Sequence, residues 1–406
     1  MTIQRLLILF AIIIATLFFY SYSASSPKTS KPPDRANSSH LSSQGNHNRG
    51  QQEIHTIPGM PPVIDPTNIY SEAAADKLEP ALNNIPHRVY VPNEWDGTVS
   101  VIDPKTFKVI DHYPTGKGPQ HIIPSWDKKR LWVLNNEGNS LTPIDPLTGK
   151  PGPNVHVDDP YNLYFTPDGK YAIVVAEARH KLDFRDPETM ALKFSVPVAC
   201  RGVNHLDFSI DGRYAVASCE FAGKLIKIDM VKYQMTDSLE LGINSMPQDV
   251  RLSADGTTFY IADLMANGVH LIDGDRFKIV GFIPTGKGAH GLLPSRDGKK
   301  LYVSNRGWSH LNAGRHGQGS IAVIDFATRK VIAQWLVPGG GSPDMGNLNI
   351  EGSQLWLGGR YDNEVYCFDT NSGKLIARIS VGDHPHGLAY WPLPGRYSLG
   401  HTGNMR

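Results

Sequence analysis

Histidine and aspartate recur at one place in a phrase that the chain repeats seven times. The residues that could bind a metal ion there are His121, His205, Asp249, His290, Asp344 and His386. Imidazole and carboxylate groups suit zinc and copper(II), and three or four of them are enough for a site. If the fold brings the repeats together, the sequence predicts a zinc or copper site to which six of the seven repeats contribute.

A second set of polar residues accompanies the first. Asn162 takes the ligand position in the remaining repeat, and five charged residues end the apolar runs that follow the phrases: Glu177, Glu220, Asp263, Arg306 and Arg360. Carboxylates there could act as a general base or orient the histidines, and the two arginines could hold an anion. The alternative is that these charges are ordinary solvated strand ends.

Short strands must position these residues. In order, the phrase reads PQHIIPSWD, PYNLYFTPDG, VNHLDFSIDG, PQDVRLSADG, AHGLLPSRDG, SPDMGNLNIEG and HPHGLAYW. Each copy except the last leads into a turn with an acidic residue and then an apolar run, and these turn acids lie 41 to 54 residues apart. A period of about 40–45 residues with several short strands per unit is typical of a β-propeller.

Counting strands predicts an all-β fold of seven four-stranded blades over residues 86–392. Residues 88–114 supply three outer strands with no inner strand before them, and residues 384–391 supply an inner strand with nothing after it. Joining the two completes a blade and closes the ring, which removes exposed sheet edges. The candidate ligands then lie on inner strands and meet at one end of a central channel, because strand side chains alternate between two faces.

The pattern resembles the YVTN-type seven-bladed β-propeller repeat proteins. The segments that carry the resemblance are VYVPNEWDGTVSVIDP, LYVSN and the phrases around His290 and His386. The resemblance implies an exported propeller but no single activity. It also implies an alternative for His290 and His386, since Pro-His-Gly is common at this position in such repeats and these two would then be ordinary repeat residues.

Composition and the first residues limit the partners and the location. The chain has 40 basic and 39 acidic residues and no basic stripe, which argues against nucleic acid as a partner. Arg5 precedes an apolar run, so residues 1–24 are interpreted as a signal peptide or a membrane anchor. We expect a disordered linker over 25–60 and a lead-in segment over 61–85. The expected location is the periplasm or the cell exterior, with membrane contact only through the N-terminal segment.

Cysteine use agrees with export. Cys200 and Cys219 fall on the same face of one predicted blade, where they form either a disulfide or a pair of neighbouring thiols. Cys367 lies in a strand and reads as a buried apolar residue. No CxxCH motif occurs, so we expect no c-type haem.

Two further segments depart from the repeat. Residues 306–319 form a long insertion, which is interpreted as a cover over part of the channel mouth or as a tolerated loop. Residues 393–406 continue past the closing strand toward the opposite face. This tail either docks across the channel exit or meets a partner.

Three functions fit these observations. The first is an exported propeller that binds zinc or copper and serves metal handling or metal-dependent chemistry. The second is an enzyme or binding protein for a small anionic organic ligand, held by Arg306 and Arg360. The third is a surface scaffold for a protein partner, with no cofactor.

Overall fold

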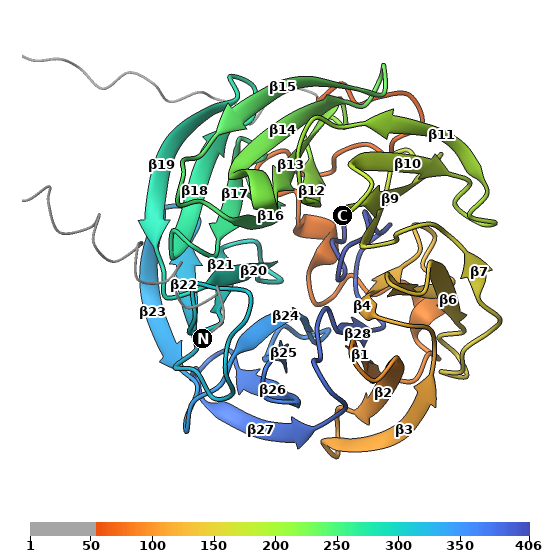
Figure 1. The fold of residues 1–406 in the computed structure, drawn as a ribbon, viewed down its shortest axis with the longest axis vertical. Coiled ribbons are helices and arrows are strands. Elements are labelled where there is room, and N and C mark those ends of the chain that lie inside the picture. The colour runs from red at the N-terminus through yellow and green to blue at the C-terminus, as the bar shows by residue number, and fades with distance from the viewer. Residues whose placement is uncertain (1–53) are drawn as a thin grey trace, which may run out of the picture. The chain divides into compact units, whose positions relative to one another are not determined.

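The computed structural model describes residues 54–406, which form seven four-stranded antiparallel sheets. The sheets are arranged in a ring, and the C-terminal residues lie inside it (Figure 1). The predicted seven-bladed, all-β fold is therefore confirmed. The predicted signal peptide or anchor and most of the predicted linker lie outside the described residues. Within the described residues, no helix is long and apolar enough to cross a membrane.

Six blades follow one another along the chain, and the first is composite. The composite blade holds β1 (Arg88–Asn93), β2 (Thr98–Asp103), β3 (Lys108–Pro114) and β28 (Ala389–Trp391). The next three blades hold β4 (Pro119–Pro124), β5 (Leu131–Asn135), β6 (Ser140–Ile144) and β7 (Val155–His156); β8 (Asn162–Phe165), β9 (Ala172–Ala176), β10 (Lys181–Arg185) and β11 (Leu192–Pro197); β12 (Val203–Phe208), β13 (Tyr214–Cys219), β14 (Lys224–Asp229) and β15 (Gln234–Glu240). The last three hold β16 (Pro247–Leu252), β17 (Thr258–Asp263), β18 (Gly268–Asp273) and β19 (Lys278–Pro284); β20 (Ala289–Pro294), β21 (Lys300–Asn305), β22 (Ser320–Asp325) and β23 (Lys330–Leu336); β24 (Pro343–Leu348), β25 (Gln354–Gly359), β26 (Glu364–Asp369) and β27 (Leu375–Ser380). Three-residue 3-10 helices lie at Ser71–Ala73, Pro80–Leu82 and Glu220–Ala222.

The ring closes as the sequence predicts. Strand β28 pairs antiparallel with β1, with Arg88 opposite Trp391 and Tyr90 opposite Ala389. Trp391 is fully buried in the core that this blade shares with its neighbours. Closure thereby covers the inner edge of β1, which would otherwise be unpaired.

The acidic turns join each inner strand to the next strand of its blade. In one of them the Ser209 hydroxyl donates to Oδ1 of Asp211 at 2.6 Å, and Oδ1 also accepts the backbone N–H of Arg213. Gly212 takes a positive φ of 75°, which a side chain would disfavour. The Ser-to-Asp hydrogen bond recurs in three other blades, so the recurrent serines have a structural role.

Most inner strands carry an irregularity just where the candidate ligands lie. The register with the second strand shifts between Pro119 and Ile122 in β4, between Val203 and Leu206 in β12, and in the same place in β16, β20 and β24. Two residues therefore stand opposite no regular partner, and the usual alternation of faces breaks. This break determines which side chains turn into the channel.

The lead-in segment lies against the opposite end of the ring from the candidate ligands. Ile69 donates its N–H to the carbonyl of Ala254, and the Tyr70 hydroxyl donates to the carbonyl of Leu252 at 2.6 Å. Ile57 is buried and bonds to the turn at Asp211. Residues 54–60 were expected to belong to the disordered linker, but they are ordered because Ile57 packs beside that turn.

Candidate metal centre

Five histidines lie together in the channel and are at most 1% exposed. They come from β4, β12, β20, the segment before β28 and the tail: His121, His205, His290, His386 and His401. Ring centroids are 4.6 Å apart for His121 and His386, and 4.7 Å apart for His205 and His401. The imidazoles of different blades are therefore in contact.

His121, His205 and His401 form one group, whose ligand atoms all lie within 4.8 Å of one another. The Nε2 atoms of all three are buried and have no hydrogen-bond partner among residues 54–406. A buried polar atom without a partner costs about 1–3 kcal/mol, and such atoms are rare. Three of them in one place form a candidate ligand set. His121 presents a lone pair at Nε2, whereas the Nε2 of His205 would have to give up its proton to bind a metal, because Nδ1 of that ring accepts from Asn162.

Backbone carbonyls orient two of the five rings. Nδ1 of His121 lies 3.1 Å from the carbonyl oxygen of Tyr161, and Nδ1 of His386 lies 3.2 Å from that of Gln120. Because a carbonyl only accepts, Nδ1 carries the proton in both rings and the lone pair lies on Nε2. Gly387 allows this packing, since a side chain there would collide with the ring of His121.

Asp249 lies beside the first group, and both of its carboxylate oxygens accept backbone N–H groups. Its Oδ1 accepts the N–H of Val250 and its Oδ2 that of Leu292, both at 2.8 Å, so the carboxylate ties β16 to β20. Oδ1 also lies 3.1 Å from Nε2 of His401, without a hydrogen bond between them. Asn162 contacts the same group, with its Nδ2 2.9 Å from Nδ1 of His205.

His290, Asp344 and His386 form a second group, and a guanidinium already fills it. Nη2 of Arg306 lies 3.0 Å from each carboxylate oxygen of Asp344 and 2.8 Å from Nε2 of His290. Nδ1 of His290 lies 2.6 Å from Oδ1 of Asp344. A metal ion there would meet the positive charge of Arg306 at close range, which makes this group the weaker candidate.

The six predicted ligands therefore do not converge on one point. They divide into two groups and one carboxylate bound to backbone N–H groups. The expectation of a single point assumed regular alternation along each inner strand. The register shifts in β4, β12 and β20 break that alternation, and His290 lies with Asp344 and His386 instead of with His121 and His205.

Burial keeps the imidazoles neutral. Loss of water around the charged form lowers the pKa of His121 and of His290 to about 4. The same cause holds the pKa of His205, His386 and His401 well below the ordinary value. Neutral imidazole is the form that binds metal ions. Burial alone would raise the pKa of Asp344, but the charge of Arg306 holds it well below its usual range.

Comparison with known proteins identifies the repeat. The model of the YNCE-like β-propeller family matches residues 55–394, which is most of the chain. The chain belongs to the YNCE-like β-propeller family. This family has the YVTN-type repeat that the sequence resembles.

Solved structures share the propeller fold at low identity. Hydrazine synthase from Kuenenia stuttgartiensis is 21% identical with a TM-score of 0.57, over 66% of this chain and 88% of that one. Dihydro-heme d1 dehydrogenase NirN in complex with DHE is 16% identical with a TM-score of 0.56, over 77% and 76%. A protein of unknown function from Desulfotomaculum acetoxidans is 15% identical with a TM-score of 0.60, over 75% and 98%. Among curated proteins we found no match.

Two glutamates of this YNCE-like propeller lie near each other at the channel mouth. Burial, reinforced by the charge of Glu220, raises the pKa of Glu177 to about 9. Burial also raises the pKa of Glu220, which accepts a hydrogen bond of 2.6 Å from Asn204. Glu177 is therefore protonated at neutral pH and could supply a proton at this end of the channel.

The other charged residues of the predicted second set are paired. Arg360 lies 2.6 Å from a carboxylate oxygen of Glu94. Asp263 accepts the N–H groups of Met246 and Ala266 and contacts His270 at 3.1 Å, so it organises loops of its blade. Arg306 belongs to the second histidine group and lies inside the channel.

The disulfide and the insertion both lie on loops near this mouth. Cys200, in the loop before β12, is joined to Cys219, which ends β13 directly before Glu220, and their Cα atoms are 5.9 Å apart. In the insertion, Ser309 donates to Asn267 at 2.7 Å and the N–H of His316 to Asp362 at 2.6 Å. These contacts fix the insertion on the loops of adjacent blades, and its role as a cover of the mouth stays a prediction.

The sequence analysis missed His401. The tail has no counterpart in the repeat, so aligning the seven phrases could not place it in the channel. The one signal was its composition, with His401 and Arg406 among glycines rather than in a solvated, charged stretch.

Proposed function

We propose that this propeller binds one zinc or copper ion in its channel and that its function is metal handling. The observation that carries the proposal is the cluster of three buried imidazoles of His121, His205 and His401. Their Nε2 atoms make no hydrogen bond, and that of His401 lies 3.1 Å from the carboxylate of Asp249. Three imidazoles are an established ligand set for zinc and also suit copper(II). A fourth ligand would come from a water molecule held in the channel.

The site suits storage or transfer of a metal ion better than catalysis by that ion. The three ligands are at most 1% exposed, so a bound ion would be shielded from solvent and from bulky substrates. If the site also performs chemistry, Glu177 is a candidate general acid, because its raised pKa keeps it protonated at neutral pH.

The other two functions lack a supporting observation of this kind. The proposed clamp for an anionic ligand used Arg306 and Arg360, and each of these arginines already faces a carboxylate, Asp344 and Glu94. An added anion would compete with those carboxylates. We therefore do not develop the small-anion or scaffold functions further.

We also propose that the protein acts outside the cytoplasm. Two observations support this location: the basic and apolar start of the sequence, and the pairing of Cys200 with Cys219. Fractionation of cells, together with counting of free thiols in the purified protein, would test it. A cytoplasmic protein with three free thiols would contradict the proposal.

Elemental analysis tests the metal site. The full chain would be incubated with zinc or copper, desalted and measured beside the His121→Gln/His205→Gln variant. We expect one tightly held ion per parent chain and none in the variant. His386→Gln is the matched control, because it changes an equally buried channel histidine outside the first group. A folded parent without metal, or a double variant that keeps its metal, would overturn the proposal.

A further inference from the structure

The tail that supplies His401 is packed inside the ring along most of its length. Leu393, Tyr397, Ser398, Leu399 and Thr402 are at most 2% exposed. The tail passes the ends of two inner strands. Ser398 donates its N–H to the carbonyl of Trp126, just after β4, and the tail also bonds to Leu163 and Phe165 of β8. It therefore fills the channel from the end opposite the mouth.

Packing of the tail against β8 fixes the position of His401. The N–H of His401 donates to the carbonyl of Leu163 at 2.9 Å, and the N–H of Phe165 donates to the carbonyl of Leu399 at 3.0 Å. Gly400 lies between these two bonds with a φ of 95°, and a side chain there would collide with Leu163 and Tyr164. The imidazole of His401 is thus positioned by backbone hydrogen bonds on both sides of a glycine.

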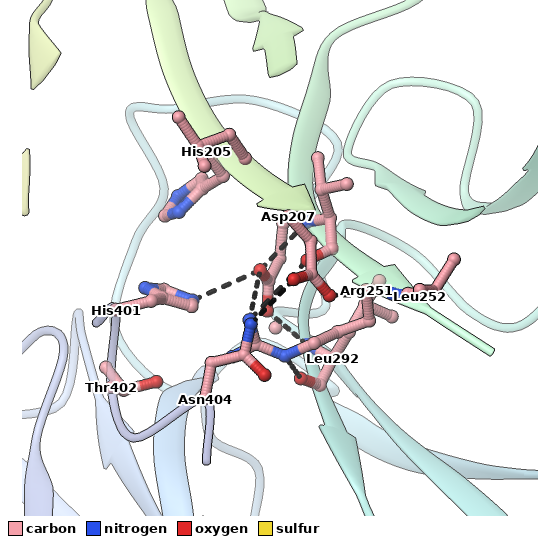
Figure 2. A network of polar contacts seen from close by, with 12 residues as sticks. His205, Asp207, Arg251, Leu252, Leu292, His401, Thr402 and Asn404 are labelled. Carbon is pink, nitrogen blue, oxygen red and sulfur yellow. Dashed lines mark hydrogen bonds and ion pairs between the residues drawn. The ribbon is translucent and has the colours of Figure 1, made fainter. Parts of the chain in front are cut away.

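A buried carboxylate anchors the end of the tail (Figure 2). Nη2 of Arg406 lies 3.1 Å from each oxygen of Asp207, and Nδ2 of Asn404 donates to Oδ1 at 2.8 Å. The guanidinium of Arg406 also lies 4.9 Å from the ring centroid of Tyr70 in the lead-in segment. Asp207 is fully buried, so removal of the tail would leave its charge without a cationic partner.

We propose that metal binding and docking of residues 393–406 are coupled, so that the tail is a plug that the metal locks in place. The inference rests on the proposed metal site and adds its regulation. The ligand His401 and the anchor Arg406 belong to one short segment. The metal site is therefore complete only when Arg406 is docked on Asp207. By linkage, a metal that binds only the docked state strengthens docking by the same factor by which docking strengthens metal binding. Release of the metal then requires the tail to loosen.

Hydrogen exchange of the full-length protein, with and without zinc, tests the coupling directly. We expect amide exchange over residues 396–406 to slow by about tenfold or more with zinc, which corresponds to about 1.4 kcal/mol. Strands β17 to β19, remote from the tail, serve as the internal reference. In His401→Gln, zinc is expected to leave exchange of the tail unchanged. Equal tail exchange with and without zinc in a protein that binds zinc would overturn the inference.

A variant remote from the ligands tests the reverse direction. Arg406→Met removes the anchor without touching any imidazole, and we expect zinc affinity to fall about tenfold or more. Arg396→Met is the matched control, because Arg396 is a half-buried arginine of the same tail that donates to the carbonyl of Pro62 and lies over the ring of Tyr397 but is not bonded to Asp207. Unchanged zinc affinity in a folded Arg406→Met protein would contradict the coupling. Absence of zinc binding in the parent would instead overturn the metal site itself.

Discussion

Each channel histidine is neutral because burial removes the water that would stabilise its charged form. For His121 and His290 this sets the pKa near 4, about two units or more below that of an exposed imidazole. The hydrogen-bond partner of each imidazole then determines whether its Nε2 is available to bind a metal ion. His121 faces a carbonyl and keeps a free Nε2, whereas the Nε2 of His290 accepts from Arg306.

These shifts predict that the metal-free protein loses stability in mild acid. Between pH 6.5 and about 4 the unfolded chain binds protons on these histidines and the folded chain does not, so the free energy of unfolding falls as pH falls. The slope is up to about 1.4 kcal/mol per pH unit for each histidine. Urea unfolding of the metal-free protein from pH 7 to pH 4.5 would measure it. The His121→Gln/His205→Gln variant should show a shallower slope, and an equal slope would contradict the buried, neutral state.

Arg306 predicts the metal stoichiometry. Its guanidinium lies where a second ion would bind to His290, Asp344 and His386, so the parent should hold one ion. Replacement of the cation in Arg306→Met frees Asp344 and His290 and is expected to raise zinc content to about two ions per chain at saturation. Titration followed by mass spectrometry under native conditions would measure this. Arg360→Met is the control, since Arg360 pairs with Glu94 outside the group, and an Arg306→Met protein that still holds one ion would contradict the argument.

At the scale of elements, the inner strand with its irregularity is the unit that builds the site. The repeat phrase predicts these strands, their position around the channel and most of the polar residues on them. It does not predict which way His121 or His290 turns, because that depends on a register shift at positions that look regular in the sequence. His401 could not be predicted for another reason: its N–H bonds to the carbonyl of Leu163 in a distant strand, and no local sequence pattern encodes that contact.

The disulfide belongs to the same scale, since it connects the loop before β12 to the end of β13. It closes a loop between residues 19 apart in sequence, for which the loss of chain entropy in the unfolded state is about 3 kcal/mol. We expect the Cys200→Ala/Cys219→Ala variant to lose about that much stability in urea unfolding. Reducing agent should shift the parent's midpoint and leave the variant's unchanged. A parent that is insensitive to reductant under unfolding conditions would contradict the bond.

At the scale of the whole molecule, seven sheets act as one body because the last strand completes the first blade. Strand β28 contributes Ala389, Tyr390 and Trp391 to the core shared by the composite blade and its neighbours. The ring is therefore expected to unfold cooperatively even though each blade contacts mainly the next.

Two deletions separate closure of the ring from filling of the channel. Removal of residues 385–406 takes away β28 and should abolish cooperative thermal unfolding and give aggregation through the open edge of β1. Removal of residues 393–406 keeps β28, so the ring should still close and unfold cooperatively. It should do so at a lower temperature, because Asp207 loses its cationic partner, and it should bind zinc more weakly than the parent. Thermal unfolding followed by circular dichroism and size-exclusion chromatography would distinguish the two. Equal behaviour of both deletions would contradict this division of roles.

The position of His401 in the sequence has a consequence in time. Its group joins residues 121, 205 and 401, and the last of these follows every strand of every blade. During synthesis the chain must therefore produce all seven blades, and close them with β28, before the third imidazole can arrive. Contacts between such distant residues form late in folding. An ion bound by all three histidines would thus be present only in the completely folded protein, and a partly synthesised chain would lack the complete binding site.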